Sequence, residues 1–382
     1  MITGVARSGT TLLAECLDHH PHILCFPDPM NELFKGFIHF AYDKVSGEKK
    51  PAGYPIDHFF FSGNPKVSQF LDDTDFKHDI PDFLRDELLE RISKRGGRFC
   101  PSLKNTVKEC QANRFDELIL EILALLYKEA APKDCLRLGF KDAWCEQLLL
   151  PLSKTFPDMK FINIIRDPRA VISSNFHSKS KYPLFFSVRD WRKSVYYSWK
   201  YQFDSLPLRE RFFYLKYEDL VECSEKTLEK VTAFLKVSPC NEMLSRPFRK
   251  PNSGYADVED TQTISHQSKE KWKINFPKNL RTQVEVYCLP EMRKMGYSSQ
   301  FSHGFASTLL HTFLGQQIPY EQLGEWCRKI IPGKILYRTF WQWMNAGLEF
   351  LRICLYRMSC KYKPLIGSFF YNEQYYQWLK ET

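Results

Sequence analysis

The fold of this chain is decided by residues 1–13, which read M-I-T-G-V-A-R-S-G-T-T-L-L. They predict a short buried strand, a glycine-containing turn and the start of an amphipathic helix. Gly4 and Gly9 are separated by four residues and followed by two threonines, which is most of the P-loop pattern G-x-x-x-x-G-K-[ST]. Inward-facing N–H groups and the partial positive charge of the helix N-terminus favour a phosphate-like anion there. We expect that anion to lie against six consecutive residues, Arg7, Ser8, Gly9, Thr10, Thr11 and Leu12.

One position departs from the P-loop pattern. The lysine that should follow Gly9 is replaced by Thr10, and the cation stands earlier in the loop, at Arg7. A Walker lysine reaches the β- and γ-phosphates of a nucleoside triphosphate, and the hydroxyl residue after it holds magnesium. The loss of this lysine favours a donor with a single 5′ phospho-type group. A degenerate nucleotide-kinase loop is the alternative.

A second motif follows at residues 161–174, F-I-N-I-I-R-D-P-R-A-V-I-S-S. The first five residues predict a buried parallel strand, and Pro168 suits the first position of a helix. Arg166 and Ser174 are eight residues apart, at the strand end and two turns into that helix. A guanidinium and a hydroxyl so placed can bind one phosphate between them. The alternative is a structural ion pair of Arg166 with Asp167 or Asp142.

Together these motifs resemble the sulfotransferases that use 3′-phosphoadenosine-5′-phosphosulfate (PAPS), and the pattern is most similar to the tyrosylprotein and carbohydrate types. R-S-G-T-T-L resembles their 5′-phosphosulfate loop, and residues 166–174 resemble their 3′-phosphate motif. The resemblance covers residues 1–297, which we expect to be the sulfotransferase domain. It implies an α/β fold: a P-loop-like parallel sheet of four or five strands, with the first strand central and helices on both faces.

The resemblance also implies the catalytic residues. The family has a glutamate where an ungapped count places Asp28, and aspartate is one methylene shorter. Glu32 is the rival candidate for general base, and the alternative for Asp28 is capping of a helix that starts near Met30. Lys141 ends a predicted strand in a K-D element whose family lysine contacts the transferring group. The alternative for Lys141 is a surface lysine at a strand end. Arg7 would stabilise the developing charge beside it.

Two further elements are assigned by resemblance. Tyr217 begins a Y-E-D-L element and would frame the adenosine, with a packing role as the alternative. Lys271 directly precedes a tryptophan, as in the family's late S-K-W element, and would contact a cofactor phosphate. Lys269 could exchange roles with Lys271, and Ser253 is a weaker candidate for the same group.

The sequence therefore predicts a sulfotransferase that moves a sulfuryl group from PAPS to an acceptor hydroxyl, with no metal. A histidine base, His58 or His177, is an alternative that neither motif supports. Two other functions stay open. A P-loop kinase is disfavoured by the missing Walker lysine and the lack of a clear Walker B aspartate. A catalytically silent binding module stays open because aspartate replaces the expected glutamate. The sequence does not identify the acceptor, which could be a peptide tyrosine, a sugar, a lipid or a small natural product.

The composition limits which binding partners and which cellular compartment we expect for this protein. The 382 residues are 43% hydrophobic and 26% charged, as in soluble globular proteins, with a net charge of +9. No run of five Lys/Arg residues occurs, so we expect no nucleic-acid partner. Twelve cysteines lie at scattered spacings without C-x-x-C pairs, which disfavours zinc and predicts a reduced, cytoplasmic protein. A trimmed piece of a Golgi enzyme would instead lie in the Golgi lumen. Because the loop begins at residue 1, we expect no signal peptide.

Residues 298–382 are expected to form a second part, an aromatic and basic helical extension. Residues 335–360 carry too many charges for a membrane span. An interfacial helix there could contact a membrane surface or a lipid-like acceptor. The alternative, which we favour, is a helical hairpin packed on the main domain or on another subunit of a homodimer.

Hydrophobic periodicity and turn residues predict further elements. Residues 44–80 show little periodicity and predict a long insertion over the site. Helices are predicted at 81–95, 113–130, 189–203, 224–235 and 277–295.

Overall fold

The computed structural model describes residues 1–47, 65–101, 103–130, 134–178, 181–245, 264, 269–300, 309, 318–331, 333–357 and 372–381. The chain divides into two compact units. The sheet unit comprises Met1–Ile165, Tyr201–Asn252 and Val258–His266, and the helical unit comprises Arg166–Lys200, Ser253–Asp257 and Gln267–Thr382. The predicted boundary at residue 297 rests on sequence resemblance and stays a prediction. Each unit is described by itself.

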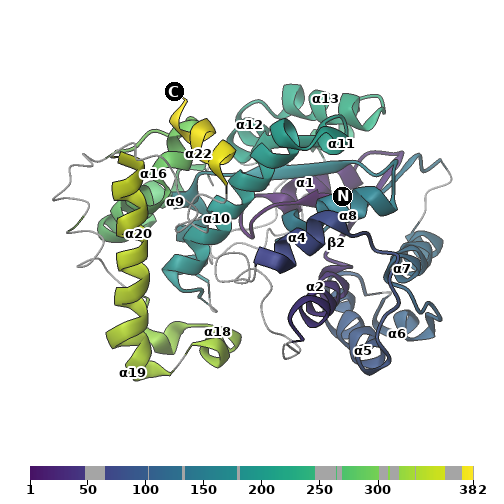
Figure 1. Cartoon of the computed structure of the whole chain (residues 1–382). Coiled ribbons are helices and arrows are strands. Elements are labelled where there is room, and N and C mark those ends of the chain that lie inside the picture. Colours follow the sequence, from purple (N-terminus) through teal and green to yellow (C-terminus); the bar gives the residue numbers. More distant parts are fainter. Residues whose placement is uncertain are drawn as a thin grey trace. The chain divides into compact units, whose positions relative to one another are not determined.

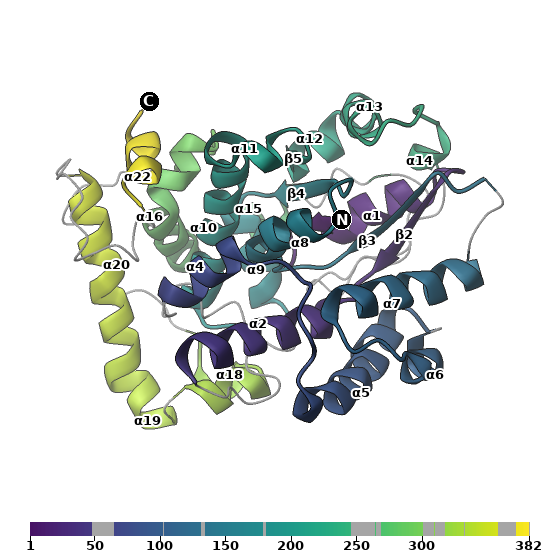
Figure 2. The ribbon, with the colours of Figure 1, turned by 45° about the vertical axis from the view of Figure 1, so that its right-hand side comes forward.

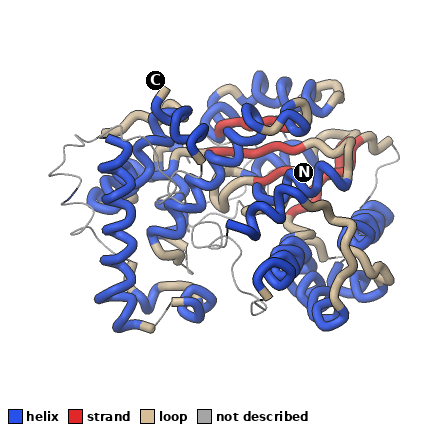
Figure 3. The backbone as a smooth tube through the Cα atoms, in the orientation of Figure 1, coloured by secondary structure: helices blue, strands red, loops and turns tan. Residues whose placement is uncertain are grey.

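The sheet unit is built on five parallel strands in the order β2-β3-β1-β4-β5. Figure 3 draws the strands in red. The strands are β1 (Ile2–Thr3), β2 (Ile23–Pro27), β3 (Arg137–Lys141), β4 (Phe161–Ile165) and β5 (Phe212–Lys216). Ile2 pairs with both Lys141 and Ile162, so the first strand is central. This confirms the predicted parallel sheet of four or five strands. All five carboxyl ends therefore meet at one edge, where open α/β sheets bind ligands.

Strand side chains alternate between two helix-covered faces. On one face, alternate strand residues such as Ile2, Ile162 and Leu215 are buried in one apolar cluster with four helices. These helices are α1 (Thr10–Asp18), α12 (Tyr217–Glu222), α13 (Ser224–Leu235) and α14 (Glu242–Ser245). On the opposite face Phe140 contacts Phe34 of α2 (Asn31–Ser46). The predicted helices on both faces are confirmed.

Below β2 and β3 in Figure 2 lie α2, α5 (Asp82–Phe99), α6 (Leu103–Thr106) and α7 (Phe115–Ala130). Aromatic contacts join α2 to α7 and to Phe76 in the segment before α5. Phe37 stacks on Phe76 at 3.9 Å between ring centroids and meets Phe115 edge-on at 5.2 Å. Helix α4 (Pro65–Asp73) and helix α8 (Leu149–Thr155) complete this side, with α11 (Leu206–Arg209) before β5. The expectation of little regular structure at 44–80 is wrong for 65–73, and residues 48–64 lie outside the described residues.

The helical unit contains eight helices among its described residues (Figure 1). They are α9 (Pro168–Phe176), α10 (Leu184–Trp199), α15 (Lys271–Asn275), α16 (Lys278–Lys294), α18 (Glu325–Ile330), α19 (Lys334–Leu336), α20 (Gln342–Arg357) and α22 (Glu373–Lys380). The predicted helices near 224–235 and 277–295 are confirmed. The one predicted at 189–203 begins earlier, after Pro183, because proline suits the position before the first helical turn.

Helix α20 packs on α10 and α16 through buried charges. Glu349 accepts from Arg189 at 2.9 Å and also pairs with Arg192, while Arg352 pairs with Glu291 at 3.1 Å. Four of these five side chains are fully buried, and the fifth, Arg189, is 14% exposed. Helix α20 thus packs on helices that belong to residues 1–297. This supports the favoured interpretation that the C-terminal residues pack on the main domain.

The outer side of the same segment is apolar. Six large hydrophobic residues on α19, α20 and the π-helical segment between them (Tyr337–Trp341) are exposed: Ile335, Leu336, Phe340, Trp343, Met344 and Leu351. In the part of the chain that the structure describes, no helix is long and apolar enough to cross a membrane. Contact of this face with a membrane or with a second subunit stays a prediction.

Replacement of Glu349 by glutamine should destabilise the protein by about 3 kcal/mol at pH 7. Burial would raise the pKa of Glu349, but Arg192, Arg189 and Arg352 outweigh it and hold that pKa at about 2, against a usual 4.5. A lowered pKa gives stability that is full above pH 4.5 and is lost as the pH falls through about 2. Urea unfolding at pH 7 and pH 3 measures both effects.

The matched control is Glu321→Gln, because Glu321 pairs with Lys334 and Arg338 at an exposed site. Exposed pairs contribute less than about 1 kcal/mol. Equal losses for the two variants would contradict the role given to the buried cluster.

Candidate functional site

The anion-binding loop follows directly from the short strand β1. Gly4 has φ 146°, and a side chain there would lie 2.6 Å from the Ile164 carbonyl oxygen. The Ser8 N–H closes the turn on the Val5 carbonyl at 3.0 Å, and Gly9, at φ 103°, leads into α1. Both glycines are therefore required by the backbone path, as the P-loop pattern predicts.

The loop has the features that an anion requires. No side chain caps the start of α1, and its first turn carries no acidic residue. The Ser8 hydroxyl is buried and has no hydrogen-bond partner among the described residues. Arg7 adds a cation and holds a left-handed backbone, φ 74°. These groups fit a phosphosulfate, because helix N-termini and inward-facing N–H groups bind such anions without further support.

Tyr217 packs against this loop. It is the first residue of α12, is 5% exposed, and belongs to the apolar cluster on the α1 face. Its ring faces Gly9 so closely that any side chain at that position would overlap it. This supports the packing alternative, and contact of Tyr217 with adenosine stays a prediction.

Gly9→Ala should weaken binding of 3′,5′-adenosine bisphosphate (PAP) by at least about tenfold and lower stability by about 1–3 kcal/mol. The added Cβ would meet the Tyr217 ring at a positive φ that alanine disfavours. Calorimetric titration and thermal unfolding measure the two effects. Gly47→Ala is the control, since Gly47 also has a positive φ but open space around it. Unchanged PAP affinity in Gly9→Ala would contradict the placement of the anion.

The structure brings Asp28 and Lys141 together at the carboxyl ends of β2 and β3. The Asp28 N–H donates to the Lys141 carbonyl at 2.6 Å, and the two side chains form an ion pair. The Lys141 side chain is 6% exposed and that of Asp28 is 17% exposed. Lys141 is thus no surface lysine. Asp28 does not cap α2 either, because the N-cap residue of that helix is Met30 and no side chain forms a cap hydrogen bond there.

The Glu32 carboxylate lies in a different set of ion pairs. Arg91 and Arg95 of α5 and Lys35 of α2 all pair with its carboxylate, Arg95 at 3.2 Å and Lys35 at 3.0 Å. Burial would raise the pKa of Glu32, but these cations lower it below its usual range. A carboxylate in three ion pairs is a poor proton acceptor, so this geometry favours Asp28 as the base.

Two residues that were not among the predicted site residues complete this sheet edge. Asp142 donates its N–H to Ile2 at 3.0 Å, and Trp144 donates its N–H to Gly4 at 3.1 Å. Trp144 also has a positive φ of 67°, and Asp28 one of 49°. Of the four described non-glycine residues with positive φ, three therefore follow β1, β2 and β3. Strained backbone of this kind gathers at functional sites. A positive φ at a residue other than glycine leaves no clear signal in a sequence, so the sequence analysis did not identify Trp144.

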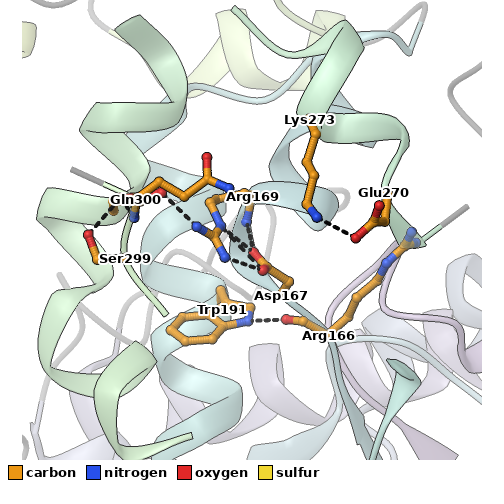
Figure 4. Close-up of polar contacts among 9 residues, drawn as sticks. Arg166, Asp167, Arg169, Trp191, Glu270, Lys273, Ser299 and Gln300 are labelled. Carbon is orange, nitrogen blue, oxygen red and sulfur yellow. Dashed lines mark hydrogen bonds and ion pairs between the residues drawn. The ribbon is translucent and has the colours of Figure 1, made fainter. Parts of the chain in front are cut away.

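In the helical unit, Arg166 opens a rigid turn. Figure 4 shows the Trp191 indole donating to the Arg166 carbonyl, at 2.7 Å, while the Arg166 side chain extends away from Trp191. Asp167 caps α9 by accepting from the Arg169 N–H at 2.8 Å. The Arg169 guanidinium binds the Asp167 carboxylate and reaches Glu285 at 2.6 Å. The turn that carries Arg166 is thus fixed by a buried ion cluster.

The other predicted residues of this unit lie on or against α9. Ser174 is on α9 and 5% exposed, and Arg166 is 9% exposed. The Arg169 guanidinium lies over the Trp272 ring at 4.2 Å, which packs α15 and its first residue, Lys271, against α9. Their roles toward a cofactor stay predictions.

The remaining candidates are less informative. The His177 Nδ1 lies 2.8 Å from the Ser173 carbonyl oxygen at the end of α9. His58 and Ser253 lie outside the described residues, and Lys269 is half-buried. Within the described ranges no group of three or more His, Cys, Asp or Glu side chains gathers as a metal would require, and the absence of a metal stays a prediction.

Comparison with known proteins gives the family. Residues 1–241 match the model of the sulfotransferase family. A putative protein-tyrosine sulfotransferase of Caenorhabditis briggsae is 24% identical over 250 residues, 64% of this chain and 67% of the relative. Carbohydrate sulfotransferase 3 of Tetronarce californica is 24% identical over 171 residues, 40% of this chain. The chain matches 39% of the length of that relative.

Among solved structures, the sulfotransferase domain of the Synechococcus PCC 7002 olefin synthase is 18% identical, with a TM-score of 0.42, and covers 72% of this chain and 87% of its own. The sulfotransferase domain from the curacin biosynthetic pathway is 16% identical, with a TM-score of 0.44, over 78% and 96% of the two chains. Because the family match spans more than half of the 382 residues, the chain belongs to the sulfotransferase family.

Proposed function

We propose that this protein transfers a sulfuryl group from PAPS to an acceptor hydroxyl. The observation that carries the proposal is the Asp28–Lys141 pair at the sheet edge where the anion-binding loop begins. A carboxylate of this kind can accept a proton, and the lysine beside it can stabilise an anion. Family membership supports the same reaction.

In the proposed reaction Asp28 takes the proton of the acceptor hydroxyl. The acceptor oxygen forms a bond to sulfur, and the bond from sulfur to the 5′-phosphate oxygen breaks. That oxygen keeps the electron pair, so PAP leaves. Lys141, Arg7 and the N–H groups of the loop stabilise the charge on the transferring group and on the leaving oxygen. A unit-charge contact at about 4 Å is worth about 4 kcal/mol at an intermediate dielectric constant.

The 3′-phosphate of the donor is assigned to Arg166 and Ser174, whose eight-residue spacing first suggested this role. Lys271 is assigned to a cofactor phosphate and Tyr217 to the adenosine side of the loop. The hydrogen bond from Trp191 to the Arg166 carbonyl supports the assignment, because a backbone that is already fixed loses no further freedom when its side chain binds a phosphate.

A titration separates this function from its rivals. Micromolar binding of PAP, unmatched by ATP with magnesium, would support a sulfotransferase, and the opposite preference would support a kinase. Transfer from ³⁵S-labelled PAPS should then be measured on a tyrosine peptide, a pyranoside, a simple phenol and a long-chain alcohol. The first two follow the names of the relatives. Tight PAP binding without transfer to any of the four would favour the silent binding module.

A further inference from the structure

We propose that Asp142 is a positioning residue that holds the turn carrying Asp28 in place by accepting the Met30 N–H. The inference rests on the proposed function, because it assigns Asp142 a part in placing the base of that reaction. It concerns a carboxylate that the mechanism above does not use.

The turn after β2 is held at both ends by two consecutive residues of the neighbouring strand end. At its start the Asp28 N–H donates to the Lys141 carbonyl at 2.6 Å. At its end the Met30 N–H donates to the Asp142 Oδ2 at 3.1 Å. The Asp142 N–H in turn donates to the Ile2 carbonyl at 3.0 Å. Asp142 therefore ties the turn that carries the base to the strand that leads into the anion-binding loop.

The turn needs the hydrogen bond to Asp142 to keep its conformation. Asp28 has φ 49°, a left-handed conformation that persists only where surrounding contacts enforce it. Met30 and Asp142 are both fully buried. Without the Asp142 carboxylate, the Met30 N–H would therefore lose its hydrogen bond and no water could replace it. The turn would then relax toward ordinary backbone angles, and the Asp28 carboxylate would move with it. Displacement of a reacting group by about 1 Å can cost on the order of 100-fold in rate.

The hydrogen bond, and not the charge, carries this role. Burial, followed by the nearby Asp28 carboxylate, raises the pKa of Asp142 well above its usual range, so charge there is unfavourable. Its Oδ1 has no hydrogen-bond partner among the described residues, and its Oδ2 accepts only from Met30. An asparagine keeps an acceptor oxygen of the same reach, so Asp142→Asn is the conservative variant.

Three variants test the proposal: Asp142→Ala, Asp142→Asn and Asp142→Ser, the last as a second truncation should alanine fail to fold. Hydrogen–deuterium exchange of the peptide spanning residues 26–34 reports on the turn without any acceptor. We expect exchange to accelerate at least about tenfold in the truncations and to stay within about twofold in Asp142→Asn. PAP affinity should stay within about twofold in all three. Unchanged exchange in the truncations would overturn the proposal.

Turnover with the best acceptor of the panel gives the second readout. We expect kcat to fall on the order of 10- to 100-fold in Asp142→Ala and to recover in Asp142→Asn. In an Asp28→Ala background, Asp142→Ala should add less than about twofold, because a residue acting through Asp28 has nothing left to position. A full additional loss there would indicate a purely structural role and overturn the proposal.

The control is Asp116→Asn, at a buried carboxylate on α7 that pairs with Arg114 and should affect neither readout. If the wild-type protein transferred no sulfuryl group to any acceptor, the proposed function would fail, while the exchange experiment would still decide whether Asp142 holds the turn.

Discussion

Asp28→Asn is expected to lower kcat by about 100- to 10,000-fold, the range for loss of a general base. The amide fills the same space but accepts no proton. Donor binding should not suffer, because Lys141 loses its ion-pair partner and is freed for the sulfuryl group. Steady-state rates and calorimetric titration with PAPS measure the two quantities, and PAPS should bind at least as tightly as to the wild type. Weaker PAPS binding would contradict this account of the pair.

Glu32→Gln is the matched control for Asp28→Asn. Glu32 lies four residues further along the chain and was the rival candidate by sequence. We expect kcat within about twofold of the wild type. Stability should fall by about 1–3 kcal/mol, because Arg91, Arg95 and Lys35 lose their common counterion at a site only partly screened by water. A kcat loss as large as that of Asp28→Asn would make Glu32 the base.

Arg166→Ala is expected to weaken PAP binding by about 100-fold, as loss of charge-assisted hydrogen bonds to a phosphate should. Adenosine 5′-phosphate lacks the 3′-phosphate, so its affinity should hardly change. The variant should therefore lose the preference for PAP over adenosine 5′-phosphate. Parallel calorimetric titrations with the two nucleotides measure that preference directly.

Two controls sharpen the Arg166 experiment. Arg166→Lys keeps the charge but loses the planar fork, so we expect an intermediate loss of PAP affinity. Arg293→Ala removes an exposed arginine from α16 of the same unit and should leave both nucleotides unaffected. An equal loss for PAP and adenosine 5′-phosphate in Arg166→Ala would place Arg166 away from the 3′-phosphate.

The sequence by itself determined the sheet and its binding edge. Gly4 and Gly9 mark a turn that favours glycine, and the five mostly apolar residues before Arg166 predict a buried strand. Such signals are local, because a backbone angle or a run of apolar residues constrains its own segment whatever surrounds it. The central position of the first strand and the start of α9 at Pro168 followed from these signals.

Only the tertiary structure distinguishes the surroundings of the two candidate bases. Asp28 and Glu32 flank the start of one helix, and nothing in their own segment separates them. Their different environments come from distant segments, Lys141 of β3 for Asp28 and the arginines of α5 for Glu32. The charges of α20 are a similar case, since nothing in the sequence marks Glu349 and Arg352 as buried, and both are fully buried. Whether a carboxylate accepts a proton, pairs with a cation or packs in a core depends on neighbours that only the folded chain brings to it.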